Sequence, residues 1–342
     1  MRLTRRRWIS TIVVLIAVAT GAYFLQRHLE YVKMHTIPAG LRAFDINDPI
    51  PTCGRWKDTM PKARDANAYR LYINARKLWR SKIAWQLTHE EFLSIFHAVQ
   101  TAANQGDWGA RALLAHFYRS GLGPLKSNHT LDIDLDKSVA IIRNAVAAGQ
   151  AWGYYDLGVA HEHGYGRAVH DGKIAWAYYL KAAELGSPEA QMALAGAYLK
   201  AQLRDAEHTM VMCAYKQGHG PAAYDLGISA ELQKNFKLAL EYHQAGTRFG
   251  SKNSAVSLRM MFDIREWGLR DKQDQAAFKE LQILPDPERE RRYDQLADAL
   301  DLNPDLKLSR LDQVLPLPPA ELPAWQSFND AIEPEPNGPP TY

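Results

Sequence analysis

The sequence has little of what sheets and enzyme active sites require. Alternation of apolar and polar residues, which is typical of strands, is scarce, and helical periodicity dominates the 342 residues. A serine nucleophile elbow and a phosphate-binding loop are both absent. The helical periodicity predicts an all-α protein. Because no set of residues supports catalysis, we also predict that it is not an enzyme and needs no cofactor. A binding function is therefore the first hypothesis.

Only two cysteines are present, Cys53 and Cys213, and they lie 160 positions apart. So few cysteines do not favour a zinc site. The interpretation that we favour is an unpaired Cys213 that fills a seam of small residues between helices, as buried cysteines often do. The alternative is a disulfide, which an exported compartment permits.

Neither sign of charge dominates the sequence, whose net charge is +3 at pH 7. Residues 1–33 alone carry about +5 by direct count, so the rest of the chain carries about −2. A nucleic-acid-binding protein usually has a basic patch or stripe on its folded part. The charge distribution therefore does not indicate nucleic acid as a partner.

Residues 1–33 are interpreted as a targeting segment. Three arginines, Arg5 to Arg7, precede an uncharged run over residues 8–25, which is just long enough to span a bilayer. A cleaved signal peptide is one interpretation, because Ala17–Ala19 offers a small-x-small cleavage site. We favour an uncleaved anchor in the inner membrane, because the run continues apolar beyond that site. The basic flank then stays inside, and the rest of the chain is expected in the periplasm.

Four glycines recur at intervals of 37, 32 and 32 residues and close four similar helical segments. Glycine suits the residue after a helix, where the chain turns through a left-handed conformation. A return every 30–40 residues is the signature of stacked helical hairpins. The four positions are Gly149, Gly186, Gly218 and Gly250.

A pair of one large and one small residue precedes each of these glycines. Leucine and the residue four positions later lie on one helix face, and the small residue lets a neighbouring helix approach closely. Each unit is therefore predicted to be two antiparallel helices, and a fifth, degraded copy begins near Ser254. The pairs are Leu114-Ala115, Leu157-Gly158, Leu194-Ala195 and Leu226-Gly227.

The second unit, "GYYDLGVAHEHGYG" followed by "IAWAYYLKAAELG", resembles the Sel1-like repeat family. Units three and four have a shorter loop between their helices and look closer to tetratricopeptide repeats. The resemblance covers about residues 107–262 and implies an all-α solenoid of helical hairpins. Such an array is usually a surface for another protein.

The repeats are expected to have different segments on either side. Residues 34–106 are predicted to be an irregular stretch followed by capping helices, one over Asp65–Trp79 and one opened by the capping box Thr88-x-x-Glu91. Residues 263–342 are predicted to hold two short helices and a proline-rich strap or tail. We interpret Leu311–Trp325 as an extended strap over the last helices, the alternative being a ligand for a proline-binding module.

Two short motifs look like metal sites but are better explained by structure. In His161-Glu162-His163 the histidines point to different sides of a helix, whereas zinc proteases space theirs at i and i+4. His161 occupies the aromatic core position of its repeat, so we predict a packed histidine. Asp132, Asp134 and Asp136 lack the glycine and the twelfth-position glutamate of a calcium loop, which favours a capped helix start.

A partner-binding stripe is predicted on the first helix of each unit, opposite the leucine seam. This stripe would face the inside of the superhelix, where solenoids commonly hold ligands. For any one of its aromatic residues, packing between helices is the alternative. The stripe consists of His116, Arg119, Trp152, Tyr155, Glu162, His163, Met192, Leu199, Lys200, Tyr224 and Glu231.

An exported Sel1-like array that ends in a "PLPPAELPAW" segment is similar to a group of bacterial proteins associated with type VI secretion lipase effectors. This resemblance implies an immunity factor that binds a secreted phospholipase effector in the periplasm and blocks it by occlusion. The alternative is an envelope-associated Sel1-like scaffold or adaptor that assembles protein complexes.

Overall fold

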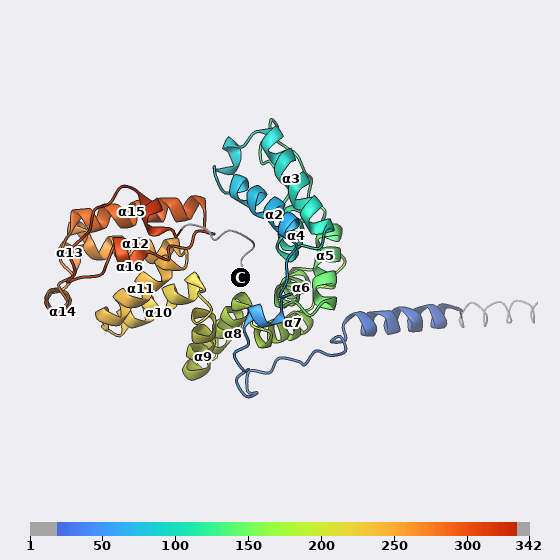
Figure 1. Cartoon of the computed structure of the whole chain (residues 1–342). Coiled ribbons are helices and arrows are strands. Elements are labelled where there is room, and N and C mark those ends of the chain that lie inside the picture. Colours follow the sequence, from blue (N-terminus) through green and yellow to red (C-terminus); the bar gives the residue numbers. More distant parts are fainter. Residues whose placement is uncertain (1–18, 334–342) are drawn as a thin grey trace, which may run out of the picture.

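The computed structural model describes residues 19–333, and the regular secondary structure of these residues is almost entirely helical. Within this range the β-type pairing consists of one isolated bridge, between Leu122 and Leu131. The prediction of an all-α chain is confirmed for the described residues. The helices follow a curved path, from blue and green through yellow to red in Figure 1.

Four helical hairpins form the middle of the chain, at the positions that the spaced glycines predicted. In each hairpin the two helices pack against each other, and successive hairpins also pack together. In Figure 1, α8 lies on the inside of the curve and α9 on the outside. The hairpins are α4 (Trp108–Ser120) with α5 (Leu135–Ala147), α6 (Ala151–His163) with α7 (Gly172–Glu184), α8 (Pro188–Lys200) with α9 (Arg204–Tyr215), and α10 (Gly220–Leu232) with α11 (Phe236–Arg248).

Local sequence explains where these helices begin and end. The side chains of Asp107, Asp171 and Ser187 accept hydrogen bonds from amides in the first turns of α4, α7 and α8. After α7, Gly186 has a φ of +95°, which a residue with a side chain adopts only with strain. A β-carbon there would also meet the backbone of Arg55 and Trp56, so this glycine both ends a hairpin and admits a neighbouring segment.

One further hairpin precedes the repeats and covers their first unit. It consists of α2 (Ala66–Trp79) and α3 (His89–Asn104), and α3 packs against α4. The predicted capping box is present, because Thr88 and Glu91 each accept the other's backbone amide. The short η2 (Ala84–Gln86) lies between the two helices.

The fifth repeat is completed by a distant helix. The first helix of this repeat, α12 (Lys252–Phe262), packs mainly against α15 (Pro287–Leu302), which is not the next helix in the sequence. Phe262 stacks on Tyr293, with ring centroids 5.9 Å apart and planes 6° from parallel. Two short helices, α13 (Ile264–Leu269) and α14 (Lys272–Glu280), are inserted between the two halves of this unit.

The proline-rich segment lies along α15 as a strap, although it is not extended throughout. Two buried arginines of α15 bind its backbone: Arg289 donates to the carbonyls of Pro316 and Ala320, and Arg292 donates to those of Val314 and Pro323. The strap contains α16 (Leu311–Val314) and leads to η3 (Phe328–Ala331), which packs against α15 and α16.

An extended segment before α2 runs across several hairpins and is fastened to them at separate points. His35 Nδ1 lies 2.7 Å from a carboxylate oxygen of Asp171, and Phe44 stacks on Trp176 with centroids 5.2 Å apart. The segment ends in η1 (Trp56–Thr59), whose first amide donates to Gln217 of the α9–α10 turn.

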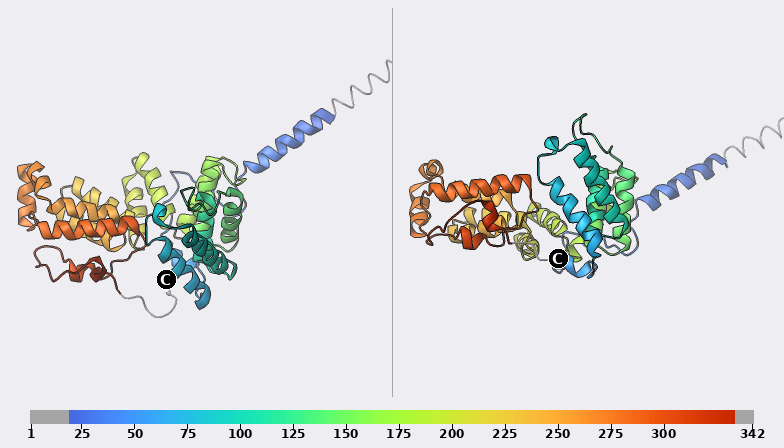
Figure 2. Two further views of the ribbon diagram at one scale, coloured as in Figure 1. Left: turned by 90° about the horizontal axis from the view of Figure 1, so that it is seen from above. Right: turned by 45° about the horizontal axis from the view of Figure 1, so that its top comes forward.

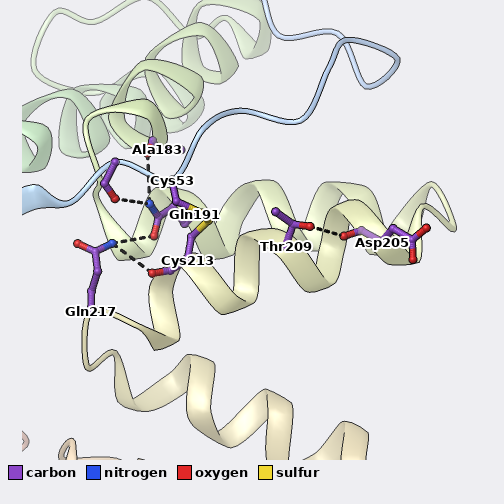
Figure 3. The surroundings of a disulfide bond; sticks show 8 residues. Cys53, Ala183, Gln191, Asp205, Thr209, Cys213 and Gln217 are labelled. Atoms are coloured by element: carbon purple, nitrogen blue, oxygen red, sulfur yellow. Dashed lines mark hydrogen bonds between the residues drawn. A yellow bond between two sulfur atoms is a disulfide. The ribbon is translucent and has the colours of Figure 1, made fainter.

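A disulfide between Cys53 and Cys213 ties this segment to α9 (Figure 3), with the two α-carbons 5.4 Å apart. The interpretation favoured from sequence, an unpaired Cys213 in the seam, was therefore wrong, although Cys213 does lie in the core between α8 and α9. Gln191 on α8 supports the junction by donating to the carbonyl of Gly54. The sequence alone could not show that Cys53 lies beside Cys213, because the segment that carries Cys53 has no regular structure.

The two ends of the array meet across the inside of the curve. Asp305, in the loop after α15, receives two hydrogen bonds from Arg76 of α2, at 2.5 and 2.6 Å, and lies 3.8 Å from Arg80. The end of α15 points toward α2 in all three views (Figures 1 and 2). Side chains 229 residues apart in the sequence thus close the array into a ring.

The predicted membrane anchor, residues 8–25, lies mostly outside the described residues. A helix over residues 19–34 projects from the array in Figure 2, with Tyr23, Phe24 and Leu25 exposed. Among residues 19–333, no helix is both long enough and apolar enough to cross a membrane.

Candidate partner-binding surface

The predicted stripe residues all lie on the first helices, α4, α6, α8 and α10, but they differ in what they contact. His116 and Arg119 are neighbours near the end of α4, with Arg119 Nη2 3.4 Å from His116 Nδ1. The His116 ring also lies 5.6 Å from that of Trp79. Burial, assisted by the nearby Arg119, Arg80 and Arg76, lowers the pKa of His116 to about 4. The imidazole is therefore neutral at physiological pH.

On α6, two residues of the stripe contact the second helix of the same hairpin, α7. The Tyr155 ring lies 5.5 Å from that of Tyr179, and the Tyr179 hydroxyl donates to Glu162 at 2.5 Å. Burial raises the pKa of Tyr179, and the bond to Glu162 raises it further. His163 is exposed at the end of the helix. Tyr179 thus holds Tyr155 and Glu162 in place, whereas His163 is exposed to solvent.

On α8 and α10 the stripe divides between packing and exposure. Met192 packs against the core, whereas Leu199 and Lys200 are exposed. Tyr224 and Glu231 both contact His243 of α11: the Tyr224 ring is 5.8 Å from the His243 ring, and a Glu231 carboxylate oxygen is 2.9 Å from Nε2. These last two residues contribute to packing within their hairpin.

A cavity of about 670 Å³, which we call the central cavity, opens where the first helices begin. Three tryptophans line it: Trp56 from η1, Trp108 from α4 and Trp152 from α6. Trp56 and Trp108 meet edge to face at 5.8 Å, and the Trp152 indole donates to Gln150. The polar lining includes Lys57, Arg76, Glu189, His219 and Lys307. Aromatic rings beside cations suit the anchor residues of a protein partner.

Only Trp152 of these three tryptophans belonged to the predicted stripe. A signal for Trp108 was its place in the first turn of a first helix, where Trp152 also lies, although the two tryptophans occupy different repeat positions. Trp56 gave no such signal, because it reaches the cavity from the disulfide-bonded segment.

Asp156 on α6, close enough to Glu189 of the central cavity to be affected by its charge, has a carboxyl group with a raised pKa. Burial raises the pKa of Asp156 to about 6, with the nearby Arg119 opposing the rise and Glu189 adding to it. Burial also raises the pKa of Tyr165, again against the effect of Arg119. Arg119, on α4, thus influences two groups of the second unit.

The two metal-like motifs have structural roles. The His161 ring stacks on Tyr178, with centroids 5.4 Å apart, and its Nδ1 lies 2.9 Å from the carbonyl of Val169. Asp134 caps α5 by accepting the amide of Lys137. Across residues 19–333, no group of three His, Cys, Asp or Glu side chains is placed to hold a metal ion.

Three solved structures from Pseudomonas aeruginosa match this chain over most of its length. The immunity protein Pa5087 is 27% identical, with 78% of this chain and 94% of that one covered and a TM-score of 0.61. The immunity protein PA5088 is 25% identical, with 78% and 94% covered and a TM-score of 0.59. The chain resembles bacterial immunity proteins. The protein PA5086 is also similar, at 26% identity, 80% and 96% coverage and a TM-score of 0.63.

The C-terminal part matches a family described as a domain of unknown function, DUF6396, over residues 254–341. No curated protein matches the sequence. The family match begins within α12 and includes α15 and the strap, which agrees with the packing of these elements on one another. The resemblance to the immunity proteins extends beyond the Sel1-like repeats, since it covers more than three quarters of the chain.

Proposed function

We propose that this chain is an immunity protein that binds and neutralises a phospholipase effector of the type VI secretion system. The observation that carries the proposal is the match to Pa5087, which is 27% identical and is covered over 94% of its length. The segment "PLPPAELPAW" after a Sel1-like array, which resembles that of lipase-effector immunity proteins, supports the choice of effector class.

The proposed mechanism is occlusion by a preformed surface. The central cavity and the exposed stripe residues His163, Leu199 and Lys200 lie on the helices that line the inside of the curve. The Arg76–Asp305 pair joins the two ends of the curve, and the Cys53–Cys213 disulfide holds the segment before α2 against α9. A surface that is already ordered loses little conformational entropy on binding, which favours tight association. The array would cover the active-site mouth or the membrane-binding surface of the effector.

The proposed location is the periplasm, with the chain anchored to the inner membrane through residues 8–25. A disulfide supports an oxidising compartment, because thiols in the bacterial cytosol are normally kept reduced. The arginines that precede the uncharged run support an orientation in which the array lies outside the cytoplasm.

Competition between sibling cells tests this function. A strain that lacks this gene should be killed by siblings that deliver the cognate effector, and the full-length chain should restore survival. Siblings that carry a catalytically inactive effector are the control, and they should not kill. If the deletion strain survives attack as well as its parent does, the immunity function is wrong. Gene neighbours that encode envelope-assembly proteins, with no effector, would then favour a scaffold.

A further inference from the structure

Cationic side chains gather around His116 at the ends of α2 and α4. We call Arg80, His116 and Arg119 the cationic cluster. The Arg80 guanidinium lies over the Trp79 ring, 3.9 Å from its centroid, and Arg119 approaches the His116 ring. Because His116 is neutral, the charge of this cluster comes from its two arginines.

Among the residues that the structure describes, the carboxylates nearest in effect to these two arginines make no hydrogen bond to them: Asp305 for Arg80 and Asp156 for Arg119. Over residues 19–333, no carboxylate oxygen lies within 4 Å of Arg119, and Asp305 approaches Arg80 no closer than 3.8 Å. The Nε of Arg80 is buried and has no hydrogen-bond partner in this range. Burying a donor without a partner is unfavourable, so a bound acceptor would stabilise this arrangement.

A second cavity, which we call the edge cavity, lies directly beside the cationic cluster. It has a volume of about 650 Å³, and its walls are mainly apolar. Ile133, which lines it, is 61% exposed although it is aliphatic. The polar lining of the edge cavity includes Asp132, whose carboxylate lies 3.0 Å from His129 Nε2. An apolar hollow beside two weakly paired arginines fits a segment that carries both an apolar side chain and a carboxylate. The residues of the lining used here are Trp79, Phe92, His116, Phe117, Leu122 and Ile133.

The molecule itself contains an example of the matching chemistry. Asp305 is carried by a loop and binds Arg76, one helical turn before Arg80, through two hydrogen bonds. Burial works against ionisation of Asp305, but the hydrogen bonds and charge of Arg76 prevail and lower its pKa. This end of α2 therefore already binds one aspartate on a loop, while Arg80 and Arg119 lack an equivalent partner.

We propose that the cationic cluster and the edge cavity form one docking site for an acidic loop of the partner protein. A carboxylate of that loop pairs with Arg119 and Arg80, and a neighbouring apolar or aromatic side chain enters the edge cavity beside Ile133. This inference rests on the proposed immunity function and specifies the chemistry by which the effector is recognised.

The test measures binding of the full-length chain to its cognate phospholipase effector by calorimetry at two salt concentrations. The double variant Arg80→Gln/Arg119→Gln should bind about 10- to 100-fold more weakly and with less dependence on salt, because it removes the paired charges. Ile133→Asp should also weaken binding about 10-fold, because it puts a carboxylate where the apolar side chain enters. Arg204→Gln, an exposed arginine at the start of α9, is the matched control and should bind as the wild type does. Circular dichroism establishes that each variant is folded.

The outcomes separate this site from the function as a whole. If the wild type binds and the double variant binds within about twofold of it, the docking site is wrong and the immunity function stands. If the wild type does not bind the effector, both fail. A folded double variant that loses self-association, or binding to anionic vesicles, while it keeps effector affinity would also overturn the site, in favour of a second copy or a lipid surface.

Discussion

In the second and fourth units, the absence of a side chain on one glycine decides how closely the two helices approach. A β-carbon on Gly227 would overlap the ring of His243, and one on Gly158 would come within 2.7 Å of the Tyr179 ring. His243 is fully buried, so its ring has no free space into which it could move. The glycine of the Leu–Gly pair is therefore required by packing and not by backbone conformation.

Replacing Gly227 by alanine is predicted to destabilise the fold by about 1–3 kcal/mol, because the added methyl overpacks the seam. The matched control is Gly196→Ala in α8, where a β-carbon would meet nothing within 4 Å. There the change should be stabilising by about 0.5–1 kcal/mol, because alanine is the better helix former. Urea unfolding followed by circular dichroism measures both. Equal stabilities for the two variants would contradict this account of the seam.

Replacing Asp156 by asparagine is predicted to stabilise the protein at pH 7. The folded pKa of about 6 lies above the ordinary value of 3.8, so the folded state holds this proton more tightly than the unfolded state. The stabilising effect of this tighter proton binding is complete below pH 3.8 and is lost as the pH rises through 6. Asp156→Asn should therefore gain about 1–3 kcal/mol over the wild type at pH 7 and little at pH 4.

Thermal unfolding at several pH values measures the gain from Asp156→Asn. Asp298→Asn, which alters an exposed carboxylate on α15, is the control and should show no such pH-dependent difference. A gain of equal size at pH 4 and pH 7 would show that ionisation of Asp156 is not the cause.

Much of the structure at this scale could be predicted from the sequence, because the interactions involved are local. The capping box at Thr88 and the glycines after α5, α7, α9 and α11 depend on residues a few positions apart. Packing of His161 followed from its position in the repeat. The roles of Tyr224 and Glu231 were less accessible, because both depend on His243 in the following helix.

At the scale of elements, the extended segment before α2 depends on one covalent bond and a few weak contacts. Cys53→Ser is predicted to lower stability by about 2–4 kcal/mol, because the disulfide restricts a long loop of the unfolded chain. The segment around η1 should also become more sensitive to protease, since the remaining contacts, such as those of Trp56 and Phe44, are separate and local.

Limited proteolysis with mass spectrometry measures this release. Reduction of the wild type should reproduce the behaviour of Cys53→Ser, and reduction should have no further effect on the variant. If the wild type resists cleavage equally well with and without reductant, the disulfide does not hold the segment in place.

Element pairing could be predicted for neighbours in sequence but not for distant partners. The four hairpins followed from the repeat, because each second helix comes directly after its first. The partner of α12 did not, since α13 and α14 separate it from α15. Nothing local distinguishes α15 from α14 as the completing helix. The choice depends on buried contacts such as the Phe262–Tyr293 stack.

At the scale of the whole molecule, the Arg76–Asp305 pair closes the array. Asp305→Asn is predicted to loosen this closure, because the neutral amide cannot accept two charge-assisted hydrogen bonds from Arg76. Hydrogen exchange should rise in residues 303–308 and at the end of α2, and the other hairpins should keep their protection. The control is Asp301→Asn, which removes an exposed ion pair with Lys252 at the last turn of α15. Unchanged exchange in Asp305→Asn would mean that packing alone closes the ring.

The ring and its central cavity could not be predicted from the repeat pattern. A regular solenoid predicts an inner face made only of first helices, which explains why Trp152 was anticipated. The other walls come from α2, η1 and the loop after α15, whose positions depend on the disulfide and on an ion pair between residues 229 positions apart. The candidate binding surface thus depends partly on how the two ends of the array close on each other.

The central claim is that this surface neutralises a phospholipase effector by covering it. The most direct measurement is hydrolysis of phospholipid vesicles by the cognate effector while purified full-length protein is titrated in. We predict that activity falls in proportion to the protein added and is abolished at a one-to-one ratio. Full phospholipase activity in the presence of excess folded protein would contradict the account.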